Sequence, residues 1–205
     1  MKVLKIILLI IVVLIAFVFI GAIFVDGKFG VEKSIVIDRP NEVVYDYVKQ
    51  LKKQPEWSVW DKMDPNSEHT YTGTDGEVGF VSAWKGNKDV GSGEQEIIAV
   101  DPGKRIDYEL RFKEPFESTS KAYTTFNTVG SDQTEVTMGF EGEMVYPMRL
   151  MLLFVNMDKT LGADFQGNLE NLKEVIEAQP MIEEEPEPFV EDIEMDEFEE
   201  EVMME

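Results

Sequence analysis

His69 is the one histidine of the chain, so it is the first residue to consider for acid–base or metal chemistry. It follows Glu68 just before a strand pattern, and no second histidine or cysteine exists to complete a zinc site. Asp61 and Asp64 place carboxylates nearby in the sequence, but their spacing with Glu68 matches no calcium loop. We expect a surface histidine among solvated loop acids. The sequence therefore predicts no catalytic residue, no metal site and no cofactor.

Bulky apolar side chains recur at positions predicted to face the interior of the fold. They can fill a solid core, or they can line a cavity for a hydrophobic ligand, and the sequence leaves both interpretations open. In a cavity, Ser82 and Tyr108 would offer a ligand polar groups. The candidate cavity residues are Trp57, Trp60, Phe80, Ser82, Trp84, Tyr108, Phe112, Phe126, Met138, Phe140, Leu161 and Phe165.

Strands must position most of these side chains. In RIDYELRF (residues 105–112), apolar residues alternate with charged ones, which is typical of a strand with one face in the core and one in water. Residues 119–129 and 134–141 repeat the alternation, and Asp101-Pro102-Gly103 and Gly130-Ser131-Asp132 provide turns. Consecutive short strands with short links favour an antiparallel sheet.

Helices flank this run of strands. Pro40 precedes a helical pattern over residues 41–51, and an aromatic helical turn, EWSVW, follows Pro55. Residues 156–178 predict a long helix with one apolar stripe. The stripe comprises Leu161, Phe165, Leu169, Leu172 and Ile176. The expected outer face comprises Asp164, Asn168, Glu170, Lys173 and Glu174.

The amino-terminal segment is continuously apolar. Residues 6–25 contain no charge, and as a helix they would span about 30 Å, the hydrocarbon thickness of a bilayer. A cleaved signal peptide usually has a shorter apolar stretch with a small-residue cleavage site, and a core helix would show a polar face. We therefore expect an uncleaved single-pass membrane anchor. Basic residues flank both ends almost equally, so the side of the membrane stays open, with a slight preference for an extracytoplasmic domain.

Charge divides the chain further. It holds 41 acidic and 19 basic residues, and residues 179–205 contribute 13 acids and no base. Such a balance repels phosphate backbones, so no nucleic-acid partner is expected. The tail is too charged to form a core and is predicted to be disordered, although Phe189, Ile193, Phe198 and Val202 form a loose stripe suited to a protein partner. With no cysteine, disulfides and thiolate chemistry are excluded.

Four stretches resemble the SRPBCC superfamily, which includes START domains, Bet v 1-like proteins and the polyketide cyclase/dehydrase and lipid transport group. They are SIVIDRPNEVVYDYV (34–48), PEWSVWDKMDP (55–65), GEVGFVSAWKGNKDVGSGEQEI (76–97) and MDKTLGADFQGNLENLKEVIE (157–177). The last is similar to the helix of bacterial members with a membrane anchor. The resemblance implies an α+β helix-grip fold, in which a long C-terminal helix crosses a curved seven-stranded antiparallel sheet, often over an apolar cavity. No catalytic residue of the family can be placed here.

The expected organisation is an N-terminal transmembrane anchor (1–26), a START-like domain (27–178) and a disordered acidic tail (179–205). The leading hypothesis is a membrane-tethered binding module for a hydrophobic small molecule or lipid. One alternative is an enzyme of the polyketide cyclase/dehydrase type, and another is an interaction scaffold that acts through its acidic tail. Fold alone does not decide among them.

Overall fold

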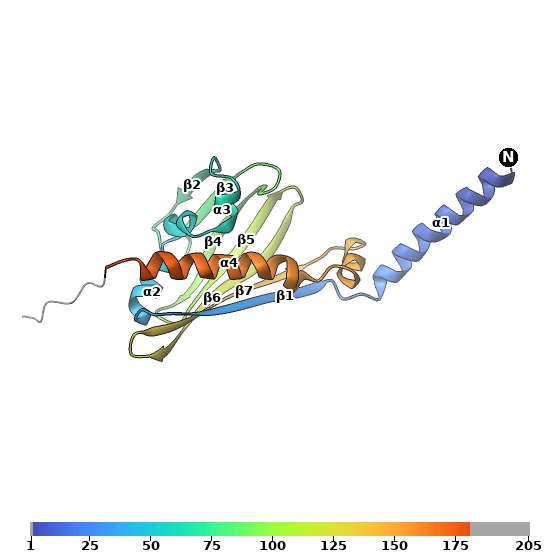
Figure 1. Cartoon of the computed structure of the whole chain (residues 1–205). Coiled ribbons are helices and arrows are strands. Elements are labelled where there is room, and N and C mark those ends of the chain that lie inside the picture. Colours follow the sequence, from blue (N-terminus) through green and yellow to red (C-terminus); the bar gives the residue numbers. More distant parts are fainter. Residues whose placement is uncertain (1, 181–205) are drawn as a thin grey trace, which may run out of the picture.

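The computed structural model describes residues 2–180 (Figure 1). The predictions for the acidic tail fall almost wholly on residues 181–205 and lie outside the described part. The strands are β1 (Lys28–Ile37), β2 (Glu68–Thr72), β3 (Val81–Lys85), β4 (Ser92–Asp101), β5 (Arg105–Glu114), β6 (Ser118–Gly130) and β7 (Gln133–Glu143). The α-helices are α1 (Lys2–Ile23), α2 (Asn41–Val48), α3 (Val59–Met63) and α4 (Met157–Glu177), and the 3-10 helices are η1 (Leu51–Glu56) and η2 (Met148–Leu153).

The seven strands form a single antiparallel sheet in the order β1-β7-β6-β5-β4-β3-β2. Every neighbouring pair except β1–β7 is consecutive in the sequence, which follows from the short turns between strands. At the turn after β4, Gly103 takes a positive φ of 72° that other residues rarely adopt. The sheet curves around α4, so the predicted α+β helix-grip class is confirmed (Figure 1).

The core lies between the concave face of the sheet and α4. Leu169, Leu172 and Ile176 of α4 are fully buried, as are Ile106 of β5 and Val136 of β7. The alternating strands therefore place their predicted apolar faces inward. The opposite face of β5 is polar: Arg111 pairs there with the carboxylates of Glu94, Glu96 and Glu109.

One prediction for α4 was wrong. Asn168 was expected on the outer face, yet only 2% of it is exposed. It lies three residues after Phe165 and four before Leu172, and helical geometry places those spacings on one face. The prediction relied on the polarity of the side chain, whereas its spacing along the helix determines which face it lies on.

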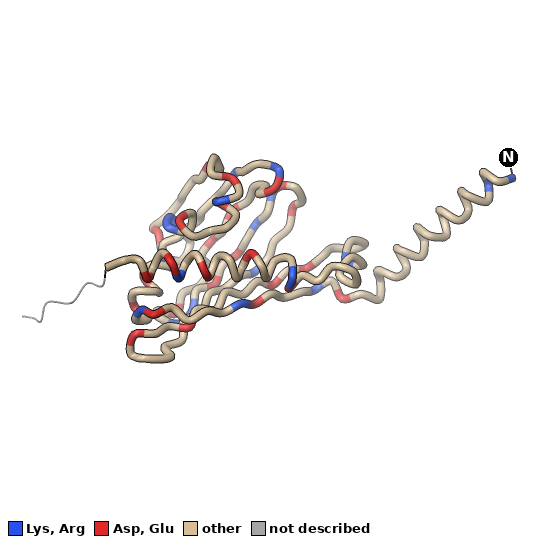
Figure 2. Tube along the Cα trace, in the orientation of Figure 1, with Lys and Arg blue, Asp and Glu red and all other residues tan. Residues whose placement is uncertain are grey.

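Helix α1 projects away from the sheet and keeps its apolar side chains exposed along most of its length (Figure 1). Figure 2 shows it free of charge between the lysines at its start and Asp26 beyond its end. Within residues 2–180 it is the one helix long and apolar enough to cross a membrane, a test that a signal sequence near the N-terminus would also pass. Among the described elements, α1 makes its main contacts with η2.

We predict that a chain of residues 27–180 folds without α1 and stays soluble, because the sheet and α4 enclose the core without it. Far-ultraviolet circular dichroism and size-exclusion chromatography should show a structured, non-aggregated protein. An unfolded or aggregated product would mean that α1 is an integral part of the domain.

Candidate functional site: a sheet–helix cavity

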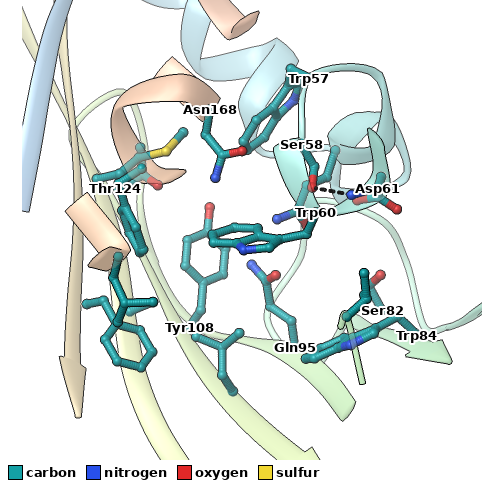
Figure 3. Close-up of a pocket in the computed structure, with 18 of the residues that line it drawn as sticks. Trp57, Ser58, Trp60, Asp61, Ser82, Trp84, Gln95, Tyr108, Thr124 and Asn168 are labelled. Atoms are coloured by element: carbon teal, nitrogen blue, oxygen red, sulfur yellow. Dashed lines mark hydrogen bonds between the residues drawn. The ribbon is translucent and has the colours of Figure 1, made fainter. Parts of the chain in front are cut away.

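A cavity of about 280 Å³ lies between the sheet, α3 and α4 (Figure 3). Ten of the twelve candidate residues line it: Trp57, Trp60, Ser82, Trp84, Tyr108, Phe112, Met138, Phe140, Leu161 and Phe165. Phe80 and Phe126 do not. They are buried in the core, where Phe80 stacks on Tyr71 and Phe126 meets Tyr45 edge to face. Whether the lining residues bind a ligand stays a prediction.

Two aromatic groups form most of the apolar wall. On the sheet, the rings of Trp84 and Phe112 meet edge to face, with centroids 5.8 Å apart. Trp84 pairs in register with Gly93, and its ring occupies the space that a Cβ at Gly93 would need. Glycine at that position therefore lets the indole lie against the sheet.

The second aromatic group joins α3 and α4 to the sheet. The Phe165 ring of α4 packs edge to face against Trp60, with centroids 5.9 Å apart, and against Phe140, with centroids 6.3 Å apart. Such edge-to-face pairs add stability beyond simple burial. They hold the three rings as one wall of the cavity.

Two asparagines of α4 fix the segment that carries Trp60. Asn168 Oδ1 accepts a hydrogen bond from the Val59 backbone N–H at 2.7 Å, and Asn171 Nδ2 donates to the Trp57 carbonyl at 2.9 Å. Ser58 begins α3 by accepting from the Asp61 N–H at 3.2 Å, the dashed contact in Figure 3. Residues 57–63, which form the roof of the cavity, are thus held by directional hydrogen bonds.

Part of the cavity wall is polar but uncharged. Its buried polar lining consists of Ser58, Ser82, Gln95, Tyr108, Thr124 and Asn168. In Figure 3 the Tyr108 hydroxyl and the Asn168 amide point toward each other across the cavity. The Trp57 indole N–H is buried and has no partner within residues 2–180. The Tyr108 hydroxyl and the Asn168 amide thus present neutral hydrogen-bonding groups to the interior of the cavity.

Tyr108 keeps its proton at neutral pH. Burial raises the pKa of its hydroxyl well above the ordinary value, and the neighbouring Thr124 hydroxyl opposes this shift to a smaller extent. The phenol therefore enters the cavity as a neutral hydrogen-bond donor. An anionic ligand group would meet no compensating positive charge there.

His69 lies in β2, with 21% of its side chain exposed, and not in the surface loop that the sequence suggested. Its Nε2 is 2.7 Å from Asp61 Oδ1, and both residues line the cavity. On its other side this pair borders a second hollow of about 310 Å³. A histidine oriented by a carboxylate can transfer a proton, and here the pair also closes the cavity wall. Asp64, which also borders the second hollow, accepts from the Asn87 N–H at 2.7 Å.

Sequence reasoning did not identify a further set of lining residues: Gln54, Ser58, Asp61, Ser67, His69, Asp89, Val90, Gln95, Leu110, Ala122, Tyr123, Thr124, Gly139 and Asn168. Some of these could have been found. Ala122, Thr124 and Leu110 share the inward alternation, and Asn168 falls on the apolar stripe of α4. Gln95 could not, because a polar residue in a strand is usually assigned to the solvent face. Within residues 2–180, no three His, Asp or Glu side chains gather as metal ligands.

Comparison with known proteins identifies one family. Residues 28–177 match the model of the family described as polyketide cyclase/dehydrase and lipid transport. That match covers every strand and α4 and leaves out α1. No curated protein sequence shows significant similarity to the chain.

Solved structures share the fold at low sequence identity. Truncated norcoclaurine synthase from Thalictrum flavum aligns with a TM-score of 0.56 at 8% identity, covering 76% of this chain and 98% of that enzyme. Major latex-like protein 151 from Panax ginseng aligns with a TM-score of 0.53 at 13% identity, covering 73% and 97%. Aha1 from Colwellia psychrerythraea gives a TM-score of 0.52 at 14% identity, covering 73% and 97%. These similarities establish the fold.

Asn168→Leu should lower the free energy of unfolding by about 1–3 kcal/mol, because the buried Val59 N–H would lose its acceptor. The matched control is Gln166→Leu, the same change at a position whose amide contacts Glu170 on the exposed side of α4. Its effect should stay within about 0.5 kcal/mol. Urea unfolding of residues 27–180, followed by tryptophan fluorescence, measures both. Equal stabilities of the two variants would show that the contact does not fix α3.

Proposed function

The chain belongs to the polyketide cyclase/dehydrase and lipid transport family, and we propose that it is a membrane-tethered protein that binds an uncharged hydrophobic molecule in its cavity. The observation that carries the proposal is the cavity itself, about 280 Å³ with aromatic and aliphatic walls. Proteins of this fold family bind hydrophobic ligands in general. The cavity lining supports the proposed ligand class, and α1 supports the proposed tether.

Several features support an uncharged ligand. Among the described residues, the polar side chains that are fully buried are all uncharged. The acids of the lining, Asp61 and Asp89, belong to α3 and to the loop after β3, and Asp61 is already paired with His69. The whole chain carries a net charge of −22, which disfavours an anion further. A molecule with a long apolar body and one hydroxyl or carbonyl group fits these constraints.

The tether is supported by the length and composition of α1. Its 22 residues match the thickness of a bilayer, and apart from its last turns, which pack on η2, its apolar side chains are exposed. A domain held at a bilayer by such a helix would meet hydrophobic molecules where they are concentrated. The domain limits proposed are residues 1–26 for the anchor and 27–178 for the binding domain.

Filling the cavity should abolish binding without unfolding the domain. Ala122 lies on β6 and lines the cavity, so Ala122→Phe would place a ring in the space that the ligand needs. The matched control is Ala163→Phe, the same change at an exposed position of α4. We expect Nile red to bind residues 27–180 and the Ala163 variant with similar affinity, and to lose at least tenfold in affinity for the Ala122 variant. Unchanged binding by the Ala122 variant, with circular dichroism confirming its fold, would place the binding site elsewhere.

Removing the Tyr108 hydroxyl should weaken the binding of a neutral amphiphile. Loss of one hydrogen bond of about 0.5–1.5 kcal/mol reduces affinity by roughly twofold to tenfold. Displacement of Nile red by decanol, compared between the native domain and Tyr108→Phe, measures the change. Tyr47→Phe provides the same chemical change outside the cavity, where that hydroxyl donates to Glu56. The native domain should also prefer decanol to decanoate, and a preference for decanoate would refute the uncharged ligand.

A further inference from the structure

The connection between β7 and α4 is unusually apolar for an exposed segment. We refer to residues 145–155 as the η2 segment. Its side chains include Val145, Leu153 and Phe154, which are 68%, 63% and 84% exposed. From Met144 to Met157 there is no acidic residue, in a chain that holds 41 of them. A contiguous exposed apolar segment of this kind marks an interaction surface.

The η2 segment is joined to the last turns of α1 by specific contacts. The Tyr146 hydroxyl donates to the Phe19 carbonyl at 3.0 Å, and the two rings meet edge to face with centroids 5.8 Å apart. A Cβ at Gly21 would lie 3.6 Å from Leu150 Cδ1, an ordinary van der Waals distance, so Leu150 lies next to this turn of α1. Arg149 Nη1 donates to the Val25 carbonyl at 3.4 Å, beyond the end of α1.

These contacts fix the depth of the segment relative to α1. Phe19 precedes Val25 by six residues, which corresponds to about 9 Å along a helix axis. The uncharged run of residues 6–25 only just equals the hydrocarbon thickness of about 30 Å. If this run spans the bilayer, both Phe19 and Gly21 lie below its surface. The side chains that touch them must then enter the bilayer too.

We propose that the η2 segment inserts into the bilayer interface beside α1 and seats the domain on the membrane. The proposal rests on the membrane tether of the proposed function and adds a second, non-spanning contact with lipid. Its exposed side chains Met148, Met151, Leu153 and Phe154 enter the acyl-chain boundary. Tyr146 lies beside Phe19 below the bilayer surface, while Arg149, beside Val25, lies at the level of the head groups.

The backbone of the segment suits such a position. Unpaired amide and carbonyl groups are costly in an apolar medium, and here several are paired within the segment itself. Arg149 N–H donates to the Val145 carbonyl, and the Phe154 and Val155 N–H groups both donate to the Met151 carbonyl. Continuity with α1 identifies the occupant as lipid, because the segment packs directly on the helix that would be in lipid.

This arrangement also orients the cavity. Lys28 of β1 pairs with Glu143 of β7, Phe112 pairs with Ser118, and Lys85 pairs with Ser92, so these strand ends lie at the same end of the sheet as the η2 segment. The loop from Gly86 to Gly91 lies at this end too, and it carries Asp89, an exposed residue of the cavity lining. Seating by the η2 segment therefore turns this end of the cavity toward the membrane.

The full-length chain allows a direct test because it contains no cysteine. Single substitutions Leu153→Cys and Phe154→Cys, each labelled with an environment-sensitive fluorophore, are reconstituted in phosphatidylcholine vesicles with brominated acyl chains. Leu14→Cys reports on the span itself. Val129→Cys is the matched control, because it is also an exposed apolar residue, 52% exposed, but lies in the β6–β7 hairpin at the opposite end of the sheet.

We expect the labels at positions 153 and 154 to be quenched several-fold more strongly than the label at position 129, with position 14 quenched as well. If position 14 is quenched and position 153 behaves like position 129, then α1 spans the membrane but the η2 segment does not insert into the interface. If position 14 is not quenched, α1 does not span the membrane, and both the proposed tether and the proposed insertion of the η2 segment are refuted. If the label at position 153 is unquenched and unlabelled Leu153→Cys chains form disulfide-linked dimers when an oxidant is added, the segment contacts a second copy and the proposal is overturned.

Discussion

The width of the sheet is the constraint on which the rest of the structure depends. Seven strands about 4.8 Å apart make a face roughly 30 Å across, whereas a helix with its side chains covers only about 10 Å. Helix α4 packs chiefly on β1 and β7 at one side of the sheet. The concave surface of β3, β4 and β5 must therefore be covered by something else. Residues 57–63 provide a thin roof there, and the space beneath it is the cavity.

A thin roof needs directional contacts, because it buries too little surface to be held by packing alone. Asn168 and Asn171 supply them by bonding the backbone on either side of Ser58. The cost is a polar group inside an apolar space, and Asn168 therefore also presents its amide to the cavity beside Tyr108 (Figure 3). The Asn168 side chain that holds the roof in place therefore also adds a polar group to the cavity lining.

The sequence predicted the fold well because the fold depends on repeated patterns. Alternation in β5, β6 and β7 and the stripe on α4 each draw on many residues, so one exception such as Asn168 changes little. The site depends on single contacts and was predicted less completely. His69 was placed in a loop because nothing in the sequence shows that β2 returns it to Asp61. Phe80 and Phe126 were assigned to the cavity because alternation tells which side chains face inward but not where the interior is hollow.

The contacts between α1 and the domain determine how the cavity is oriented relative to α1. A flexible tether would leave the domain free to rotate, and the cavity would face the membrane only part of the time. Here Tyr146, Leu150 and Arg149 contact three separate residues near or just beyond the end of α1, so contacts at three positions join the helix to the domain. The strand register then places the loop after β3 on the side of the molecule that carries α1. Because β7 leads directly into the η2 segment, the strand that carries Met138 and Phe140 of the cavity wall also connects that wall to the joint. The position and orientation of the cavity relative to α1 therefore follow from one continuous stretch of chain.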